Sequence, residues 1–215
     1  SLRVPLYQFS HQEGHFASAA LNTPIKNSER YIAFHFSGGT TEAVLCENQC
    51  FKIVGGTKDI ALGQLIDRVG VRLGFEFPAG KYLDEIADGT EYDIKITPTK
   101  VQDGYFNLSG LETQLYKMID NNLQNDVIVN LLFNEILLII NKTMEELKDL
   151  YKVDKFLFAG GVSSSKFIQN NINAYFAEEE LSGDNAVGIA VLGGIEYGKE
   201  ASNNFTIKWL YTKNY

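Results

Sequence analysis

A long apolar stretch, DVIVNLLFNEILLIINKTMEELKDLY at residues 126–151, constrains the fold of this chain most strongly. Its pattern predicts a helix that begins near Asn125 or Asp126 and becomes polar only in its last third. Other parts of the protein must cover the apolar first two-thirds of this helix. Because Asn130, Asn134 and Glu135 interrupt the run, it lacks the roughly 18 uninterrupted apolar residues expected of a membrane-crossing helix.

The composition is that of a globular domain. The 215-residue chain is 45% hydrophobic and 21% charged, which is enough for a sizeable core. The first residues contain no basic segment followed by an apolar one, so no signal peptide is visible and a cytoplasmic location is expected. The formal charge of −8 argues against binding of nucleic acid through the chain's own surface, so an RNA partner would need a local basic patch or another subunit.

The remaining elements form a mixed α/β series. Residues 31–36, 42–47 and 50–56 are typical of three strands in a meander, with SGGTT as the first turn. We expect a helix in 57–75 capped by Thr57, and a last helix in 182–199 capped by Ser182. Between them, further helices are expected in 81–89, 109–119 and 162–172, a buried strand in 155–161, and a β-prone segment at 92–96. This order fits a ribonuclease-H-like α/β unit, which actin-like ATPases contain twice and which is visible once here, from about residue 31 to 199.

Two glycine-rich turns follow strands and are candidates for phosphate contact. In strand-SGGTT-strand, backbone N–H groups can face an anion and hydroxyls add donors. In strand-GGVSSS-helix, the start of a helix attracts negative charge. Each turn alone is more often only a turn, but two of them in one unit strengthen the prediction of a binding site.

His11 and His15 lie four residues apart, so on a helix both imidazoles can reach one metal ion. The zincin pattern His-Glu-x-x-His places its glutamate directly after the first histidine, where this chain has Gln12. Glu13 lies about 200° around the helix from His11, so the pattern lacks the base of a metalloprotease.

Further ligands for such an ion would have to come from elsewhere in the chain. His35 enters the SGG turn and Asp184 begins the last helix, although a strand histidine and a helix-start acid are also common for structural reasons. Cys46 and Cys50 could face each other across a hairpin, but two cysteines form neither a disulfide framework nor a zinc site.

Six motifs in this order resemble those of one known family. VPLYQFSHQEGHFASA resembles Val-Pro…His-x-Glu-Gly-His-x-x-Ala, and HFSGGTTEAVL resembles Val-Ser-Gly-Gly-His/Asn-Thr-Gln. The stretch GGTKDIALGQLIDRVGVRLGFEFPAGKYLDEIA is similar to the family's Gly-x-Thr-x-Asp-x-Ala…Tyr-Pro-Gly-Gly segment. LSGLET, FAGGVSSS and LSGDNAVGIA match its Phe-Ser-Gly-Leu-Lys-Thr, Gly-Gly-Val-x-x-Asn and Cys-Thr-Asp-Asn-x-x-Met-Ile-Ala. The family is TsaD, the tRNA threonylcarbamoyl-adenosine transferases, formerly called O-sialoglycoprotein endopeptidases or glycoproteases.

The resemblance implies an actin-like ATPase (ribonuclease-H-like) fold of which this chain forms the second lobe. It implies a divalent iron or zinc ion, and ATP or threonylcarbamoyl-adenylate in the full-length protein. The implied metal ligands are His11, His15 and Asp184, with His35 as a candidate fourth ligand because some relatives place a metal-reaching tyrosine there. The implied substrate and nucleotide residues are His35, Phe36, Ser37, Gly38, Gly39, Asp67, Gly80 and Ser165.

The resemblance also divides the chain into three expected parts. Residues 1–30 lead in from the family's first lobe and carry the HQEGH helix. Residues 31–200 form the second lobe, with a helical insertion at about 57–150, and residues 201–215 form a C-terminal tail. The family's first lobe has no counterpart in this sequence, so nucleotide binding by this chain alone should be weak.

Departures from the family pattern leave the function open. They are Thr40 for His or Asn, Glu42 for Gln, Gln64 for Glu, Glu112 for Lys and Ser165 for Asn.

One interpretation is a threonylcarbamoyl transferase that acts on tRNA within a complex, with a TsaB-like subunit or a second copy as partner and no membrane contact. A second is a non-catalytic paralogue that serves as a partner subunit. The third, a metalloprotease, lacks a positioned base.

Overall fold

Six strands form one sheet in the order β4-β3-β2-β1-β5-β6. The computed structural model describes residues 6–48, 50–182 and 186–202. Strands β1 to β3 form the predicted antiparallel meander, and β5 pairs in parallel with β1 on its other side. The strands are β1 (Arg30–Phe36), β2 (Thr41–Glu47), β3 (Cys50–Thr57), β4 (Tyr105–Phe106), β5 (Phe156–Ala159) and β6 (Tyr175–Phe176).

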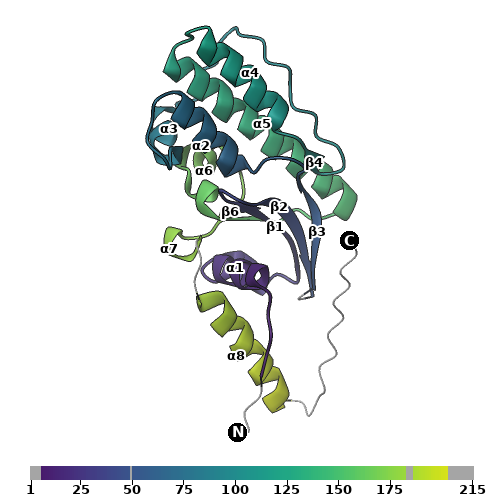
Figure 1. The fold of residues 1–215 in the computed structure, drawn as a ribbon. Coiled ribbons are helices and arrows are strands. Elements are labelled where there is room, and N and C mark those ends of the chain that lie inside the picture. Colours follow the sequence, from purple (N-terminus) through teal and green to yellow (C-terminus); the bar gives the residue numbers. More distant parts are fainter. Residues whose placement is uncertain (1–5, 49, 183–185, 203–215) are drawn as a thin grey trace.

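Helices cover both faces of this sheet (Figure 1). One face carries α2 (Leu62–Arg72), α3 (Gly80–Ile86), α4 (Ser109–Asp120), α5 (Asn125–Tyr151) and α6 (Lys166–Asn171). The other carries α1 (His11–Ala20), below which lies α8 (Val187–Ser202). Three short helices complete the described chain, namely η1 (Pro24–Asn27), η2 (Gly161–Ser164) and α7 (Glu179–Ser182).

The alternation of β1 side chains separates two apolar cores. Phe34 and Phe36 belong to the larger core, under α2 to α6. Ala33 belongs to the smaller core, which includes Phe16 of α1. Because neighbouring strand residues point to opposite faces, His35 lies on the α1 face, where its ring contacts that of Phe16 at a centroid distance of 6.3 Å.

The polar residues that interrupt the apolar run of α5 anchor an extended segment, residues 88–100. The Asn130 side-chain oxygen accepts bonds from the Asp88 and Gly89 N–H groups, both at 3.0 Å. The buried Glu135 carboxylate accepts one from the Thr99 N–H at 2.7 Å. Buried polar groups are stable when paired in this way, so these residues have a role in the core.

The interruptions in its apolar run argue against a membrane-crossing helix, but by length and composition α5 could cross a membrane. It is the one such helix among the residues that the structure describes. However, 67% of its most apolar 18-residue window is buried inside the protein. This is the environment of a core helix, and it supplies the cover that the apolar pattern requires.

Three local predictions are wrong because tertiary contacts override the local sequence. Thr57 does not cap a helix: α2 begins at Leu62, whose N–H donates to the Thr41 hydroxyl of β2 at 2.7 Å. Residues 92–96 form no strand, and the backbone on either side, at Thr90 and Thr99, is bonded to side chains of α5 instead of a sheet neighbour. Ser182 ends α7 and does not start α8, which begins at Val187.

Candidate metal and nucleotide site

The histidine pair lies on α1 as predicted, with its two rings turned toward each other. The Nε2 atoms of His11 and His15 are 3.0 Å apart, and the ring planes meet at 83°. In the neutral pair, one Nε2–H donates to the lone pair of the other nitrogen. His15 is buried, whereas His11 is exposed at the rim.

A capping box starts α1 and explains why Glu13 is no catalytic base. The Ser10 side chain accepts a hydrogen bond from the Glu13 N–H, and the Glu13 carboxylate accepts one from the Ser10 N–H. This reciprocal pair satisfies two N–H groups at the start of the helix. The glutamate is therefore used for folding, which agrees with the argument against a protease.

Polar contacts fix α1 to the rest of the molecule at both ends. Near its start, the Gln12 amide donates to the Glu42 carboxylate of β2 at 2.7 Å. Near its end, the Ser18 hydroxyl donates to the carbonyl oxygen of Leu181 in α7 at 3.1 Å. Burial raises the pKa of the Glu42 carboxyl, and the bond from Gln12 opposes that shift.

Helices α1 and α8 cross in direct backbone contact. A Cβ atom added at Gly188 would lie 1.8 Å from the Gly14 carbonyl oxygen, closer than any side chain can approach. Small residues at both positions therefore allow the crossing. It brings the start of α8 beside the helix that carries the histidine pair.

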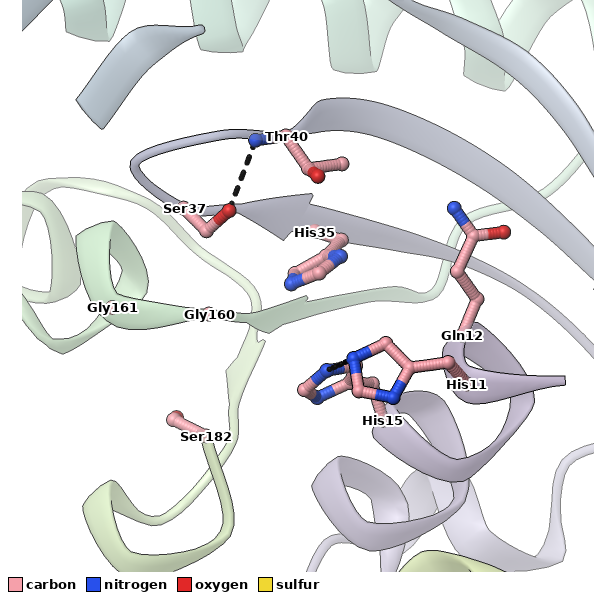
Figure 2. Close-up of a pocket in the computed structure, with 9 residues that line it drawn as sticks. All are labelled: His11, Gln12, His15, His35, Ser37, Thr40, Gly160, Gly161 and Ser182. Atoms are coloured by element: carbon pink, nitrogen blue, oxygen red, sulfur yellow. Dashed lines mark hydrogen bonds between the residues drawn. The ribbon is translucent and has the colours of Figure 1, made fainter. Parts of the chain in front are cut away.

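A cavity of about 370 Å³ opens beside the histidine pair (Figure 2). Its walls come from α1, from the two glycine-rich turns and from the end of α7. The lining residues are His11, Gln12, His15, His35, Ser37, Thr40, Gly160, Gly161 and Ser182. The fold thus brings the two predicted turns and the predicted histidine helix together. Sequence reasoning did not identify Gln12 as a lining residue.

His35 lies in this cavity with its ring against that of His15. The ring centroids are 4.7 Å apart and the planes are tilted by 35°. The turn after β5, the parallel neighbour of β1, approaches closely: Gly160 has φ 91°, and a Cβ atom there would lie 2.9 Å from His35 Cδ2 and 2.4 Å from the Phe36 carbonyl oxygen. Both the positive φ and this close approach therefore require a glycine at position 160.

The His11 and His15 nitrogens fit a metal ion. Two nitrogen ligands of a tetrahedral zinc ion, each about 2.0–2.1 Å from the metal, lie about 3.3 Å apart, close to the observed 3.0 Å. Within the described residues, no group of three or more His, Cys, Asp or Glu side chains could hold a metal ion. Asp184, the predicted third ligand, lies outside those residues, and the ligand role of His35 stays a prediction.

The SGG turn between β1 and β2 is closed by its own serine. The Ser37 side-chain oxygen accepts bonds from the Gly39 N–H at 3.3 Å and the Thr40 N–H at 3.0 Å. The Ser37 hydroxyl thus holds both of these N–H groups within the turn. Cβ atoms at Gly38 and Gly39 would meet nothing within 4 Å, so a ligand has room to approach the backbone.

A second cavity, of about 710 Å³, adjoins this turn at Gly38. Gly38 and the predicted Asp67 both line it, and Asp67 accepts a bond from the Ala79 N–H at 2.8 Å, next to Gly80. The full lining is Gly38, Gln64, Asp67, Arg68, Val71, Arg72, Phe77 and Tyr116. Three of the predicted nucleotide residues thus gather at or beside one cavity.

The arginines of the second cavity are paired with acids of α4. Arg68 lies 3.2 Å from Glu112, the position at which the resemblance implies a lysine. Arg72 contacts both carboxylate oxygens of Asp120, at 2.7 and 2.9 Å, and its guanidinium lies 4.4 Å from the Tyr116 ring centre. The negative charge of Glu112 is therefore balanced locally by Arg68.

Two predicted residues have other contacts in the structure. The Ser165 hydroxyl donates to Asp84 of α3, and the Asp84 carboxylate also accepts from the Lys166 N–H at 2.9 Å. The Phe36 side chain lies in the larger core, its ring centroid 5.3 Å from that of Phe34.

The cysteines are both free, with Cys46 buried and Cys50 exposed. Burial raises the pKa of the Cys46 thiol to about 12.

The chain matches the model of a known family. The model of the family TsaD, tRNA N6-adenosine threonylcarbamoyltransferase, matches residues 1–191. A relative of that name from Lactococcus lactis subsp. cremoris is 31% identical, over 93% of this chain and 64% of its own length. A relative from Mycoplasmopsis synoviae is 30% identical, over 94% and 68%. The chain thus spans about two-thirds of the length of these relatives.

Solved structures with the same fold include more distant proteins. HypF from T. kodakarensis superposes with a TM-score of 0.71 at 14% identity, over 92% of this chain and 38% of its own. The activator of 2-hydroxyisocaproyl-CoA dehydratase from Clostridium difficile gives 0.60 at 15% identity, over 94% and 72%. At this identity the likeness concerns the fold alone. It confirms the actin-like ATPase (ribonuclease-H-like) fold class predicted from the sequence.

Proposed function

The chain belongs to the TsaD family of tRNA N6-adenosine threonylcarbamoyltransferases, and from that premise we propose that it supplies the metal- and nucleotide-binding part of such an enzyme. The observation that carries the proposal is the histidine pair, with Nε2 atoms 3.0 Å apart at a cavity beside the SGG turn. A pure scaffold has no need of two converging imidazole nitrogens.

In this proposal, His11, His15 and Asp184 hold one iron or zinc ion, with His35 as a candidate fourth ligand. The bound ion would act as a Lewis acid on the carbonyl of the carbamoyl substrate. The 3.0 Å separation of the first two nitrogens supports this assignment. His35 is included because it lines the same cavity, and replacing it with Phe should lower metal affinity if it is a ligand.

Ser37 lines one cavity and its neighbour Gly38 lines the other, and we propose that one ligand extends along this turn into both. We assign the nucleoside of threonylcarbamoyl-adenylate to the cavity of Asp67 and Gly38, and the carbamoyl end to the cavity of the histidines. The N6 amine of a tRNA adenosine would attack the carbamoyl carbon and lose a proton, while the bond to the adenylate oxygen breaks and AMP leaves. The Gly39 and Thr40 N–H groups now donate to the Ser37 hydroxyl; on exchanging that partner for the leaving phosphate, they would stabilise the negative charge that develops there.

Binding of tRNA requires more than this chain. Its formal charge of −8 is unfavourable for a polyanion, so we propose that a TsaB-like subunit or a second copy supplies basic surface in a complex. Both cavities also open to solvent. We therefore expect weak or no ATP binding by this chain alone, and micromolar affinity in calorimetry would contradict that expectation.

A second candidate function, a non-catalytic partner subunit, is favoured by one contact. The Ser165 hydroxyl is bound to Asp84, whereas the resemblance places an asparagine that holds the nucleoside at this position. Complementation of a strain that lacks threonylcarbamoyl transfer, using the gene that encodes this chain, decides between the two. Restored tRNA modification that is lost in His11→Ala supports the enzyme, while failure together with co-purification of an active relative supports the partner subunit.

A further inference from the structure

Gln12 and Glu42 form a contact between α1 and the sheet that the proposed metal chemistry does not itself use. The Gln12 amide donates to the Glu42 carboxylate at 2.7 Å, across 30 residues of sequence. Glu42 is half-buried on β2, directly opposite His35 of β1 in the antiparallel register. A hydrogen bond to an ionised acceptor is among the stronger kinds. The contact therefore joins the start of the histidine helix to β2, next to His35 of β1.

The position of this contact determines what it can control. Gln12 follows His11 directly, and in Figure 2 its side chain points from α1 toward the strands, away from the two imidazoles. The capping box acts only within α1, and the Ser18 and Gly14 contacts fix the middle and end of the helix. The bond to Glu42 joins the first turn of α1 to strand β2 of the sheet.

A small rotation of this turn would matter for metal binding. Side chains extend to about 5–6 Å from a helix axis, so a rotation of about 20° displaces a side-chain nitrogen by about 2 Å. Metal–ligand distances tolerate only about 0.2 Å. A contact that limits rotation next to His11 therefore has a direct effect on the geometry of the nitrogen pair.

We propose that Gln12 and Glu42 are positioning residues that hold the first turn of α1 against the sheet and so preorganise His11 and His15 for a divalent transition metal. This inference rests on the proposed function, because it assumes that the histidine pair binds a metal. It assigns a role to two residues that are not among the predicted metal ligands. The family resemblance places a glutamine where this chain has Glu42, so the carboxylate acceptor of this bond is a feature of this chain.

The test uses Co²⁺, whose affinity and visible absorption spectrum both report ligand geometry. We expect Gln12→Ala and Glu42→Ala each to weaken Co²⁺ binding about 10-fold, the low end for residues that orient ligands, and to change the spectrum. The double variant Gln12→Glu/Glu42→Gln reverses donor and acceptor and should recover most of the affinity. Glu42→Gln keeps an acceptor oxygen and should lose less than Glu42→Ala.

Glu47→Ala is the matched control, since Glu47 is on the same strand but pairs with Arg30 at 2.9 Å. It should leave Co²⁺ affinity unchanged, and circular dichroism checks that every variant is folded. The inference alone is overturned if the wild type binds Co²⁺ and Gln12→Ala, Glu42→Ala and the double variant Gln12→Glu/Glu42→Gln all bind it with the same affinity and spectrum. A wild-type chain that binds no Co²⁺ would overturn the metal assignment in the proposed function as well.

Discussion

The two faces of the sheet are built in different ways. The face under α2 to α6 has a large core rich in Leu, Ile and Phe, crossed by the 27-residue α5. The face under α1 has a small core in which alanine makes up half of the described buried residues. Buried area sets most of the stabilisation, so the first face carries the stability, while the second brings polar groups together around a cavity.

The largest effect should come from truncating the larger core. Ile136 in α5 is fully buried, and Ile136→Ala should cost about 2–5 kcal/mol of unfolding free energy. On the other face, Val44→Ala removes two methyl groups from a residue that is 2% exposed and should cost about 1–2 kcal/mol. Urea denaturation measures both. Equal losses would contradict the unequal roles of the two faces.

The crossing of α1 and α8 offers a test on the histidine face. Gly188→Ala places a Cβ atom against the Gly14 carbonyl, and overpacking of this kind costs about 1–3 kcal/mol. Its matched control is Gly194→Ala in the same helix, where a Cβ atom would meet nothing within 4 Å. That change should stabilise the helix by about 0.5–1 kcal/mol. A tolerated Gly188→Ala would show that the two helices do not cross as described.

Removing the anchor of the extended segment should cost less than the core truncation. In Glu135→Ala the buried Thr99 N–H loses its acceptor, with a cost of about 1–3 kcal/mol. Glu135→Gln keeps an acceptor and should lose less. Hydrogen exchange at the Thr99 amide is the direct measurement, and an unchanged exchange rate in Glu135→Ala would exclude the anchoring role.

The smallest effect concerns pH. Burial acts to raise the pKa of Asp59, but the N–H groups of Leu108, Ser109 and Ile60 and the Ser109 side chain outweigh it and hold the pKa below its ordinary value of 3.8. Because the folded pKa is the lower one, Asp59 contributes stability above about pH 4 that is lost as the pH falls further. Asp59→Asn should flatten this acid dependence in denaturation measured from pH 6 to 2. An unchanged slope would contradict it.

The sequence predicts the regular parts of both faces well. The meander, the strand predicted in 155–161 and observed at Phe156–Ala159, and the long helix all follow from local patterns of apolar residues. The pairing of His11 and His15 is also predictable, because it depends only on their four-residue spacing along one helix. Its cavity also includes both glycine-rich turns that were singled out from the sequence.

The contacts that fix the site could not be predicted, because their partners are far apart in sequence. Asp84 and Ser165 are 81 residues apart, and Thr41 caps a helix that begins 21 residues later. Asn130 and Glu135 only interrupt an apolar pattern until the segment that they hold is known. Each contact depends on which groups meet in three dimensions, and a single sequence contains no signal for that.

The most direct test of the account is the metal content of the untagged protein, measured by elemental analysis after loading with zinc or iron and removal of excess metal. We predict one ion per chain in the wild type and little in His11→Ala and His15→Ala, because their two nitrogens, 3.0 Å apart, form half of the proposed coordination shell. A wild type without metal, or a His11→Ala/His15→Ala variant that retains the ion, would contradict the account.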